Sequence, residues 1–283
     1  GLAADARYYG EWMRERAFEK IGHLYPEING ETVIAWFWVR TVKCPNPACG
    51  AIMPLASTLD ISKKKGRKAW VKPIIDQTAK TVQFEMKKGE GKAPRAPKAG
   101  RGVQFHCLVC GEIASEDHIK SEAQSHRMST QMIGIASEGA NGRNYHSITE
   151  EHIKIAEEIN PEWEPDFEMS THPQYMAPPR YGMTTFSDLF TQRQIIALHT
   201  FSELITDVIH KVHDDAVNIG MQSDDTPLAD GGKGSWAYAE AIGFYLGLNV
   251  GRQANRLSTL CFWDSGGEKI QQVFSRQALT MNW

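Results

Sequence analysis

Four of the five cysteines stand in two close pairs, and this spacing constrains the fold more than any other feature of the sequence. Cys44 and Cys49 flank the turn PNPA, Cys107 and Cys110 flank LV, and a glycine follows each pair, so the pattern is C-x4-C-x57-C-x2-C. Two turns that each present two thiolates supply the four ligands of a tetrahedral structural site. The sequence therefore predicts a zinc ribbon in which these four cysteines hold a structural Zn²⁺.

Other arrangements of the same thiols stay open at this stage. Two disulfides, a redox dithiol or four buried thiols without a shared role are the alternatives, and the paired glycines and the spacing favour zinc over them. His106 precedes Cys107, and on an extended strand its side chain is expected to point away from that thiol. Cys261 in LCFWD is expected to be a buried or partly buried thiol outside the site.

Composition bounds the class of protein. Of the 283 residues, 41% are hydrophobic and 23% are charged, as in ordinary globular proteins. The longest apolar run, VIAWFWV, is far too short to span a membrane, and there is no N-terminal signal pattern. Thiols committed to a metal favour a reducing compartment, so we expect a cytoplasmic protein without a membrane partner. The chain starts Gly-Leu and stops at TMNW, so we expect an excerpt of a longer protein.

Residue patterns predict an α+β fold, in which a four-cysteine zinc ribbon with inserted antiparallel strands is followed by a mainly helical half. Strands are expected at 51–57, 69–75, 81–86, around VQFHC and at 128–136, and TVIAWFWVRTV (32–42) suits a strand or a short buried helix. We expect four segments: an N-terminal helical segment (1–30), a zinc-ribbon domain with a basic insertion (31–127), a small α/β segment with a Pro-rich linker (128–180) and a helical domain (181–283).

Helices are predicted most clearly in the second half. Thr191 is a plausible N-cap, with Gln194 completing a capping box, and apolar residues recur at three- and four-residue steps after it. A second helix is expected from about 235 to 259. It contains Gly243, Gly247 and Gly251, and because each interior glycine costs about 1 kcal/mol relative to alanine, we expect another backbone to approach closely there.

Positive charge is concentrated between the two cysteine pairs. Residues 62–101 contain 13 Lys and Arg against 3 Asp and Glu, which leaves 18 basic and 31 acidic residues elsewhere. Within KKKGRKAW, cations could contact phosphates and Trp70 could stack on a base, or the run could be a solvated loop with a core tryptophan. The candidate nucleic-acid residues are Lys63, Lys64, Lys65, Arg67, Lys68 and Trp70.

Further motifs carry weaker signals. DGGKGS (230–235) lacks the spacing of a phosphate-binding loop, which favours a flexible loop before a helix. His210 and His213 lie near the end of a predicted helix, where two imidazoles on a polar face are favoured over a metal pair. No G-x-S-x-G, H-E-x-x-H or dinucleotide motif occurs, so no self-contained catalytic constellation is predicted.

Several of these motifs together resemble a known family. GEWMRERAFEKIGHLYP, ETVIAWFWVRTVKCPNPACGAIMPL, SKKKGRKAW, YGMTTFSDLFTQRQ and the stretch from EKIQQVFSRQAL to TMNW are similar, in this order and over nearly the whole chain, to the adenine-specific DNA methylases that contain a zinc ribbon. In that family a Gly-rich S-adenosylmethionine motif lies upstream of this region, and an Asn/Asp-Pro-Pro-Tyr catalytic motif lies downstream. Neither occurs here, since PPRY (178–181) has no Asn or Asp before it.

The resemblance implies an insert between the cofactor-binding and catalytic parts of a DNA adenine-N6 methyltransferase, not catalytic by itself. S-adenosylmethionine would be a cofactor of the full-length enzyme only. The partners would be DNA and the remainder of the methyltransferase chain, against which Arg193, Gln194 and Arg276 would pack. Two alternatives are a zinc-stabilised protein–protein assembly module without direct DNA contact, and a complete enzyme with an unrecognised site.

Overall fold

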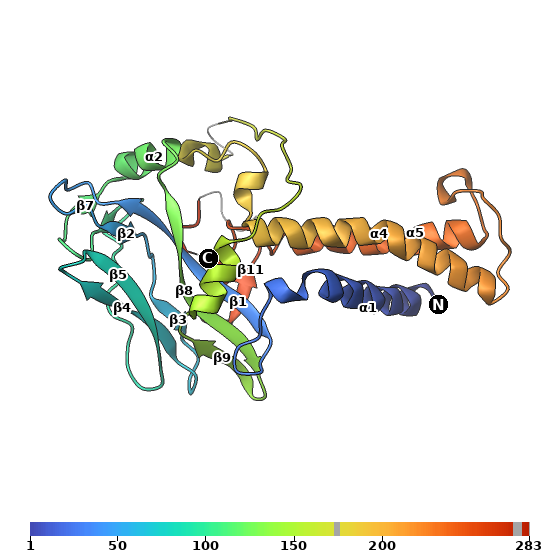
Figure 1. The fold of residues 1–283 in the computed structure, drawn as a ribbon, viewed down its shortest axis with the longest axis horizontal. Coiled ribbons are helices and arrows are strands. Elements are labelled where there is room, and N and C mark those ends of the chain that lie inside the picture. The colour runs from blue at the N-terminus through green and yellow to red at the C-terminus, as the bar shows by residue number, and fades with distance from the viewer. Residues whose placement is uncertain (173–175, 274–278, 283) are drawn as a thin grey trace. The chain divides into compact units, whose positions relative to one another are not determined.

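The computed structural model of the chain describes residues 1–172, 176–273 and 279–282 (Figure 1). It divides into two compact units, each assembled from separate stretches of sequence. The helical unit comprises Gly1–Tyr25, Ile159–Glu164 and Gln192–Leu257. The sheet unit comprises Pro26–Glu158, Pro165–Thr191 and Ser258–Trp283. Both units are therefore discontinuous, whereas each of the four predicted segments is a single stretch of chain.

Three helices form the helical unit, and they lie side by side in Figure 1. They are α1 (Leu2–Ile21), α4 (Gln192–Asn218) and α5 (Ser235–Ala254), with the short 3-10 turns η1 (Gly22–Leu24) and η4 (Leu228–Asp230). Buried apolar residues recur at three- and four-residue steps on each helix, so one stripe per helix faces a shared core. That core contains Tyr9, Met13, Ala17, Leu204, Val208, Val212, Ala239, Ile242 and Leu246.

The ends and glycines of α5 differ from expectation. The helix ends at Ala254 rather than near Thr259, and Gly234 is its N-cap. A Cβ on Gly243 would lie 2.5 Å from Cγ1 of Ile209 on α4, whereas Gly247 and Gly251 have no such neighbour within 4 Å among the described residues. The expectation of a close backbone approach is therefore wrong for the described chain, because the tight contact at Gly243 is with a side chain.

Within the part of the sheet unit that the structure describes, two larger antiparallel sheets stand beside two two-stranded hairpins. The first has the order β2-β1-β8-β9, and its strands are β1 (Val33–Lys43), β2 (Ile52–Pro54), β8 (Ser129–Gly139) and β9 (Gly142–His146). The second has the order β3-β4-β5, with β3 (Asp60–Ser62), β4 (Ala69–Asp76) and β5 (Thr81–Lys88). The predicted antiparallel insertion between the cysteine pairs is confirmed as this second sheet.

The two sheets share one core. On β1, Ala35, Phe37 and Val39 are buried in alternation and pack with residues of β4 and β5 such as Val71 and Phe84. This alternation suits a strand and is incompatible with a helix, so the strand interpretation of 32–42 is confirmed. The buried side chains of β1 therefore pack the first sheet against the inserted sheet.

Short elements complete the sheet unit. They are β6 (Phe105–His106), β7 (Ile113–Ala114), β10 (Phe262–Asp264), β11 (Lys269–Gln271), α2 (Glu116–Gln124), α3 (Glu150–Glu157), η2 (Pro178–Tyr181) and η3 (Ser187–Leu189). Ser115 caps α2 and Thr149 caps α3, each by accepting the backbone N–H three residues later. The sequence analysis missed α2, which is too short to show a strong periodicity.

Residues 262–271 contain strands although they lie in the predicted helical domain. Within this range, β10 and β11 pair as an antiparallel hairpin. Asp264 favours the turn because its carboxylate accepts the backbone N–H groups of Gly266 and Gly267. The fold is thus α+β with antiparallel sheets, as predicted, but its C-terminal part belongs with the strands. Among the described residues, no helix combines the length and apolar character that crossing a bilayer requires.

Candidate metal centre and basic loop

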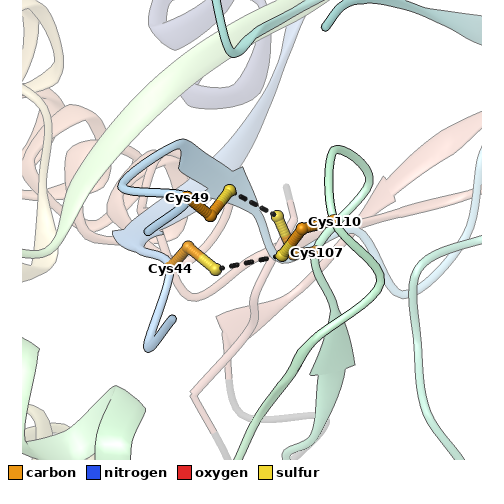
Figure 2. Close-up of side chains that lie close together, drawn as sticks. All are labelled: Cys44, Cys49, Cys107 and Cys110. Carbon is orange, nitrogen blue, oxygen red and sulfur yellow. Dashed lines mark hydrogen bonds between the residues drawn. The ribbon is translucent and has the colours of Figure 1, made fainter. Parts of the chain in front are cut away.

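The four paired cysteines converge, although 57 residues separate the two pairs (Figure 2). Their sulfur atoms all lie within 4.8 Å of one another. The Sγ atoms of Cys44 and Cys110 are 3.6 Å apart, and those of Cys49 and Cys107 are 3.9 Å apart. Each of these two close contacts joins cysteines of opposite pairs, which is the arrangement expected if both pairs face one centre.

Each cysteine pair lies at the end of an antiparallel hairpin. The first follows β1 and precedes β2, and the second lies between β6 and β7. Gly50 and Gly111 adopt φ of +66° and +81°, a conformation that glycine takes at little cost, and this turns each chain back on itself. Each turn is closed by a backbone hydrogen bond of its own: Cys44 N–H donates to the Ala51 carbonyl, and Cys107 N–H donates to the Glu112 carbonyl.

The sulfur geometry can accommodate a tetrahedral ion. With zinc–sulfur bonds of about 2.3 Å, a regular tetrahedron has sulfur–sulfur edges of about 3.8 Å. The two separations across the pairs, 3.6 and 3.9 Å, lie on either side of that value. A disulfide requires about 2.05 Å, so none of the four cysteines is joined to another. The cluster could hold a metal ion, and its all-thiolate donor set suits a thiophilic one.

The surroundings affect the thiols unequally. Burial raises the pKa of Cys44 and of Cys107, while a hydrogen bond from the Glu112 backbone N–H lowers the pKa of the exposed Cys110. The Lys80 ammonium donates to the Ala48 carbonyl within the first turn, 2.7 Å away. Burial of uncompensated thiolates is unfavourable, so a bound cation would favour deprotonation of the cluster.

Two other residues considered in the sequence analysis, His106 and Cys261, lie outside the cluster. His106 is not one of the four grouped residues, and its Nδ1 lies 3.2 Å from the Gly111 carbonyl oxygen, where it can donate a hydrogen bond. Cys261 is buried and also stands apart from the cluster, as the sequence analysis expected. The four predicted metal ligands are thus the four residues that the structure brings together.

The predicted nucleic-acid residues are placed less uniformly. We call Lys63–Lys68, the connection between β3 and β4, the basic loop. Lys63 Nζ lies 3.4 Å from an Asp60 carboxylate oxygen. Lys64 Nζ and an Arg67 guanidinium nitrogen lie 3.3 and 3.1 Å from the same Glu268 carboxylate oxygen. Three of the five candidate cations are therefore paired with carboxylates of this chain.

Glu268 anchors the basic loop from a buried position. Its side chain is only 4% exposed, and its second carboxylate oxygen accepts hydrogen bonds of 2.9 Å from both the Ser62 and the Tyr145 hydroxyls. Burial alone would raise the pKa of Glu268, but the hydrogen bonds from Tyr145, Ser62 and Lys64 and the charge of Arg67 outweigh it and lower the pKa. The carboxylate therefore stays ionised and holds the loop against the sheet.

Lys65, Lys68 and Trp70 differ from these paired cations. Both lysines are exposed, and neither forms an ion pair within the described ranges of the chain. Trp70 is half-buried on β4, opposite Lys87 on β5. Gly91 lies so close that a Cβ there would be 2.6 Å from the ring atom Cη2 of Trp70. The indole is therefore held partly by packing and partly faces solvent.

The remaining motifs have structural partners. Residues 231–234 connect η4 to α5 and include the N-cap Gly234, as expected for a loop before a helix. His210 and His213 both lie against the Trp236 ring, with centroids 5.6 and 5.1 Å away, and neither belongs to a metal-ligand group in the described part of the chain.

Three residues are predicted to pack against the remainder of a methyltransferase, and the structure describes two of them. Arg193 is buried, its guanidinium donates to the Leu24 carbonyl, and it lies over the Tyr25 ring, so this side chain serves the helical unit itself. Gln194 is half-buried on α4. Arg276 lies outside the described residues.

Sequence reasoning missed Glu268, the residue that organises the basic loop. It lies 201 positions after Arg67, in a Gly-rich turn with no motif, and only the pairing of distant segments shows its role.

No protein-family model, no curated protein and no solved structure matches this chain.

Proposed function

We propose that this chain is the zinc-ribbon-containing insert region of an S-adenosylmethionine-dependent DNA adenine-N6 methyltransferase, and that it engages DNA and contributes to target recognition. It is not catalytic by itself, because the cofactor and catalytic motifs of the resembling family are missing from its sequence. The observation that carries the proposal is the convergence of four thiols beside an inserted, strongly basic sheet.

Zinc is the proposed ion. Four cysteine sulfurs with separations of 3.6 and 3.9 Å across the pairs suit tetrahedral Zn²⁺, which prefers thiolates and closed four-ligand sites when its role is structural. Bound there by Cys44, Cys49, Cys107 and Cys110, the ion would supply folding free energy and no catalytic chemistry. It would join the β1–β2 hairpin to the β6–β7 hairpin, and so fix both ends of the inserted sheet.

DNA is the proposed partner of the basic insertion. The 13 cations of residues 62–101 give this part of the chain a local charge of +10, in a protein whose net charge is −3. Such a segment attracts the phosphate backbone and releases counterions on binding. The exposed Lys65 and Lys68 are the members of the basic loop best placed for phosphates, since Lys64 and Arg67 already neutralise Glu268.

A salt titration of DNA binding tests this proposal. The double variant K65S/K68S removes two exposed charges, and K20S/K154S removes two exposed lysines outside the basic segment and serves as the matched control. We expect K65S/K68S to weaken duplex binding about tenfold and to reduce the slope of log K against log salt by about two, while the control changes neither. Equal affinities of the two variants would contradict a DNA role for the loop.

A second candidate function rests on a different observation. On α5, the side chains of Phe244, Tyr245 and Leu248 are 63%, 52% and 58% exposed, a cluster of large apolar groups that favours contact with another protein. In this alternative the ribbon and helices form an assembly module and the cations only aid solubility. Self-association or partner capture that is insensitive to salt and lost in F244S/L248S, with no DNA binding, would support it over the first.

A further inference from the structure

A cleft opens beside the basic loop, between three segments of the sheet unit. Its volume is about 490 Å³, which lies within the range of small-molecule sites, about 300–1,000 Å³. One wall is the stretch before and in β3, the second is the basic loop with Trp70, and the third is the segment after β5. These walls contribute Asp60, Lys63, Lys68, Trp70, Lys92 and Pro94, among others.

The chemistry of this cleft is cationic and aromatic at once. Lys63, Lys68 and Lys92 line it together with Asp60 as a carboxylate, and Asp60 already pairs with Lys63. Lys92 lies outside the run KKKGRKAW, so the fold adds to the cleft a cation that the motif does not contain. A ligand with both a negative charge and a flat apolar face fits such walls better than a simple anion.

Trp70 is built into the cleft rather than merely near it. Its backbone is paired with Asp60 on one side and with Lys87 on the other, which fixes the position of the side chain on the central strand of its sheet. Gly91 adopts φ +146° and lies directly against the ring, where any Cβ would collide with it. A bare backbone on one side thus lets the indole remain at the cleft, where it is half-buried.

We propose that this cleft binds a single unpaired nucleotide of DNA, with the base stacked on Trp70 and the flanking phosphates on Lys63, Lys68 and Lys92. This inference rests on the proposed DNA-binding function and adds to it a preferred substrate form. A base within a duplex has both faces covered by its neighbours, so only an extrahelical or single-stranded base can offer a face to an aromatic side chain.

Two DNA probes test the cleft: a mixed-sequence duplex, and the same duplex with one unpaired base at its centre. We expect the chain to bind the bulged probe about tenfold more tightly, because aromatic stacking favours an unpaired base by roughly that factor. W70L, which keeps an apolar side chain but removes the ring, should abolish this preference. K92S should reduce the affinity for the bulged probe more than the affinity for the duplex.

K65S is the matched control, since Lys65 belongs to the basic loop but does not line the cleft. K65S should reduce the affinity for both probes by the same factor and leave the preference for the bulged probe unchanged. A mononucleotide added as competitor distinguishes a free nucleotide from one within a strand: competition at micromolar concentration would overturn the DNA-strand assignment. Metal content and the circular-dichroism spectrum of each variant verify that it is folded, and W70F, which retains an aromatic ring, should restore part of the preference.

The outcomes separate this inference from the proposed function. Two outcomes would overturn the nucleotide cleft and leave DNA engagement standing. In the first, K65S/K68S weakens duplex binding but the chain shows no preference for the bulged probe. In the second, the preference for the bulged probe survives in W70L. Binding of neither probe overturns both. A bulge preference that W70L and K92S remove and K65S retains supports the cleft as the site of the unpaired nucleotide.

Discussion

The cysteine cluster and the basic loop are both sets of one chemical type, yet the fold treats them in opposite ways. The cysteines are far apart in sequence and converge within 4.8 Å. The cations are adjacent in sequence but do not meet at one centre, since Lys63 pairs with Asp60 while Lys64 and Arg67 pair with Glu268. Sequence proximity is therefore no guide to a shared surface, whereas ligand spacing within a turn is a good guide to a shared centre.

The physical reason is the counter-charge that each set can share. Four thiolates repel one another, but one cation bound between them would attract all four to a common point and fix their placement. Neighbouring lysines and arginines also repel one another, and each is stabilised by a carboxylate or by solvent. In the basic loop, one buried carboxylate collects two cations and two hydroxyl donors, and this decides which lysines stay available.

Replacement of one cluster cysteine is expected to have the largest effect, because it tests whether the four thiols share one ion. We expect C107S to lose stoichiometric metal and to unfold the sheet unit, because structural zinc sites contribute about 10–16 kcal/mol of apparent binding free energy to folding. C261S changes another buried cysteine and should keep the metal. Elemental analysis and thermal unfolding measure both effects. Equal metal content in the two variants would contradict the assignment of the four ligands.

Removal of the buried carboxylate is the next largest effect. E268Q leaves Lys64 and Arg67 without their partner and weakens the hydrogen bonds from Ser62 and Tyr145, so we expect a loss of about 2 kcal/mol in the free energy of unfolding. D60N removes the partner of the exposed Lys63 and should cost less than about 1 kcal/mol. Urea unfolding measures both, and a larger loss in D60N would reverse the roles assigned to the two carboxylates.

A pH series sharpens the role of Glu268 further. Its pKa in the folded chain is lower than its ordinary value of 4.5, so its stabilising contribution is present above that pH and is lost as the pH falls through the folded pKa. The difference in unfolding free energy between wild type and E268Q should therefore narrow below about pH 4.5. A difference that stays constant or widens in acid would show that the carboxylate is not the stabilising group.

Single cation changes within the loop give the smallest expected effects. K65S should alter the free energy of unfolding by less than about 0.5 kcal/mol, because the side chain is exposed. R67S should cost about 1 kcal/mol, since it removes an ion pair with Glu268 and a hydrogen bond to the Asn141 carbonyl. For DNA affinity we expect the reverse order, with a larger loss in K65S than in R67S. If the two variants are indistinguishable in both assays, the individual cations of the loop have no separate roles.

Several features of the fold could be predicted because local chemistry imposes them. The cysteine turns with their glycines and the strands β1 and β5 depend on residues a few positions apart. Missed features depend on distant segments: the β10–β11 hairpin lies in a predicted helical domain, and the expected contact at the α5 glycines exists only between Gly243 and the Ile209 side chain.

By itself, the sequence determined which four thiols could meet, that an antiparallel insertion separates the two pairs, and that its charge is positive. Only the tertiary structure decided which of those charges are available, because Glu268 comes from a strand turn far along the chain, and it decided that Lys92 and Gly91 join Trp70 in a cleft. Spacing along the chain specifies turns and faces, whereas partners of buried charges depend on how remote elements pack, and local propensities carry no record of that packing.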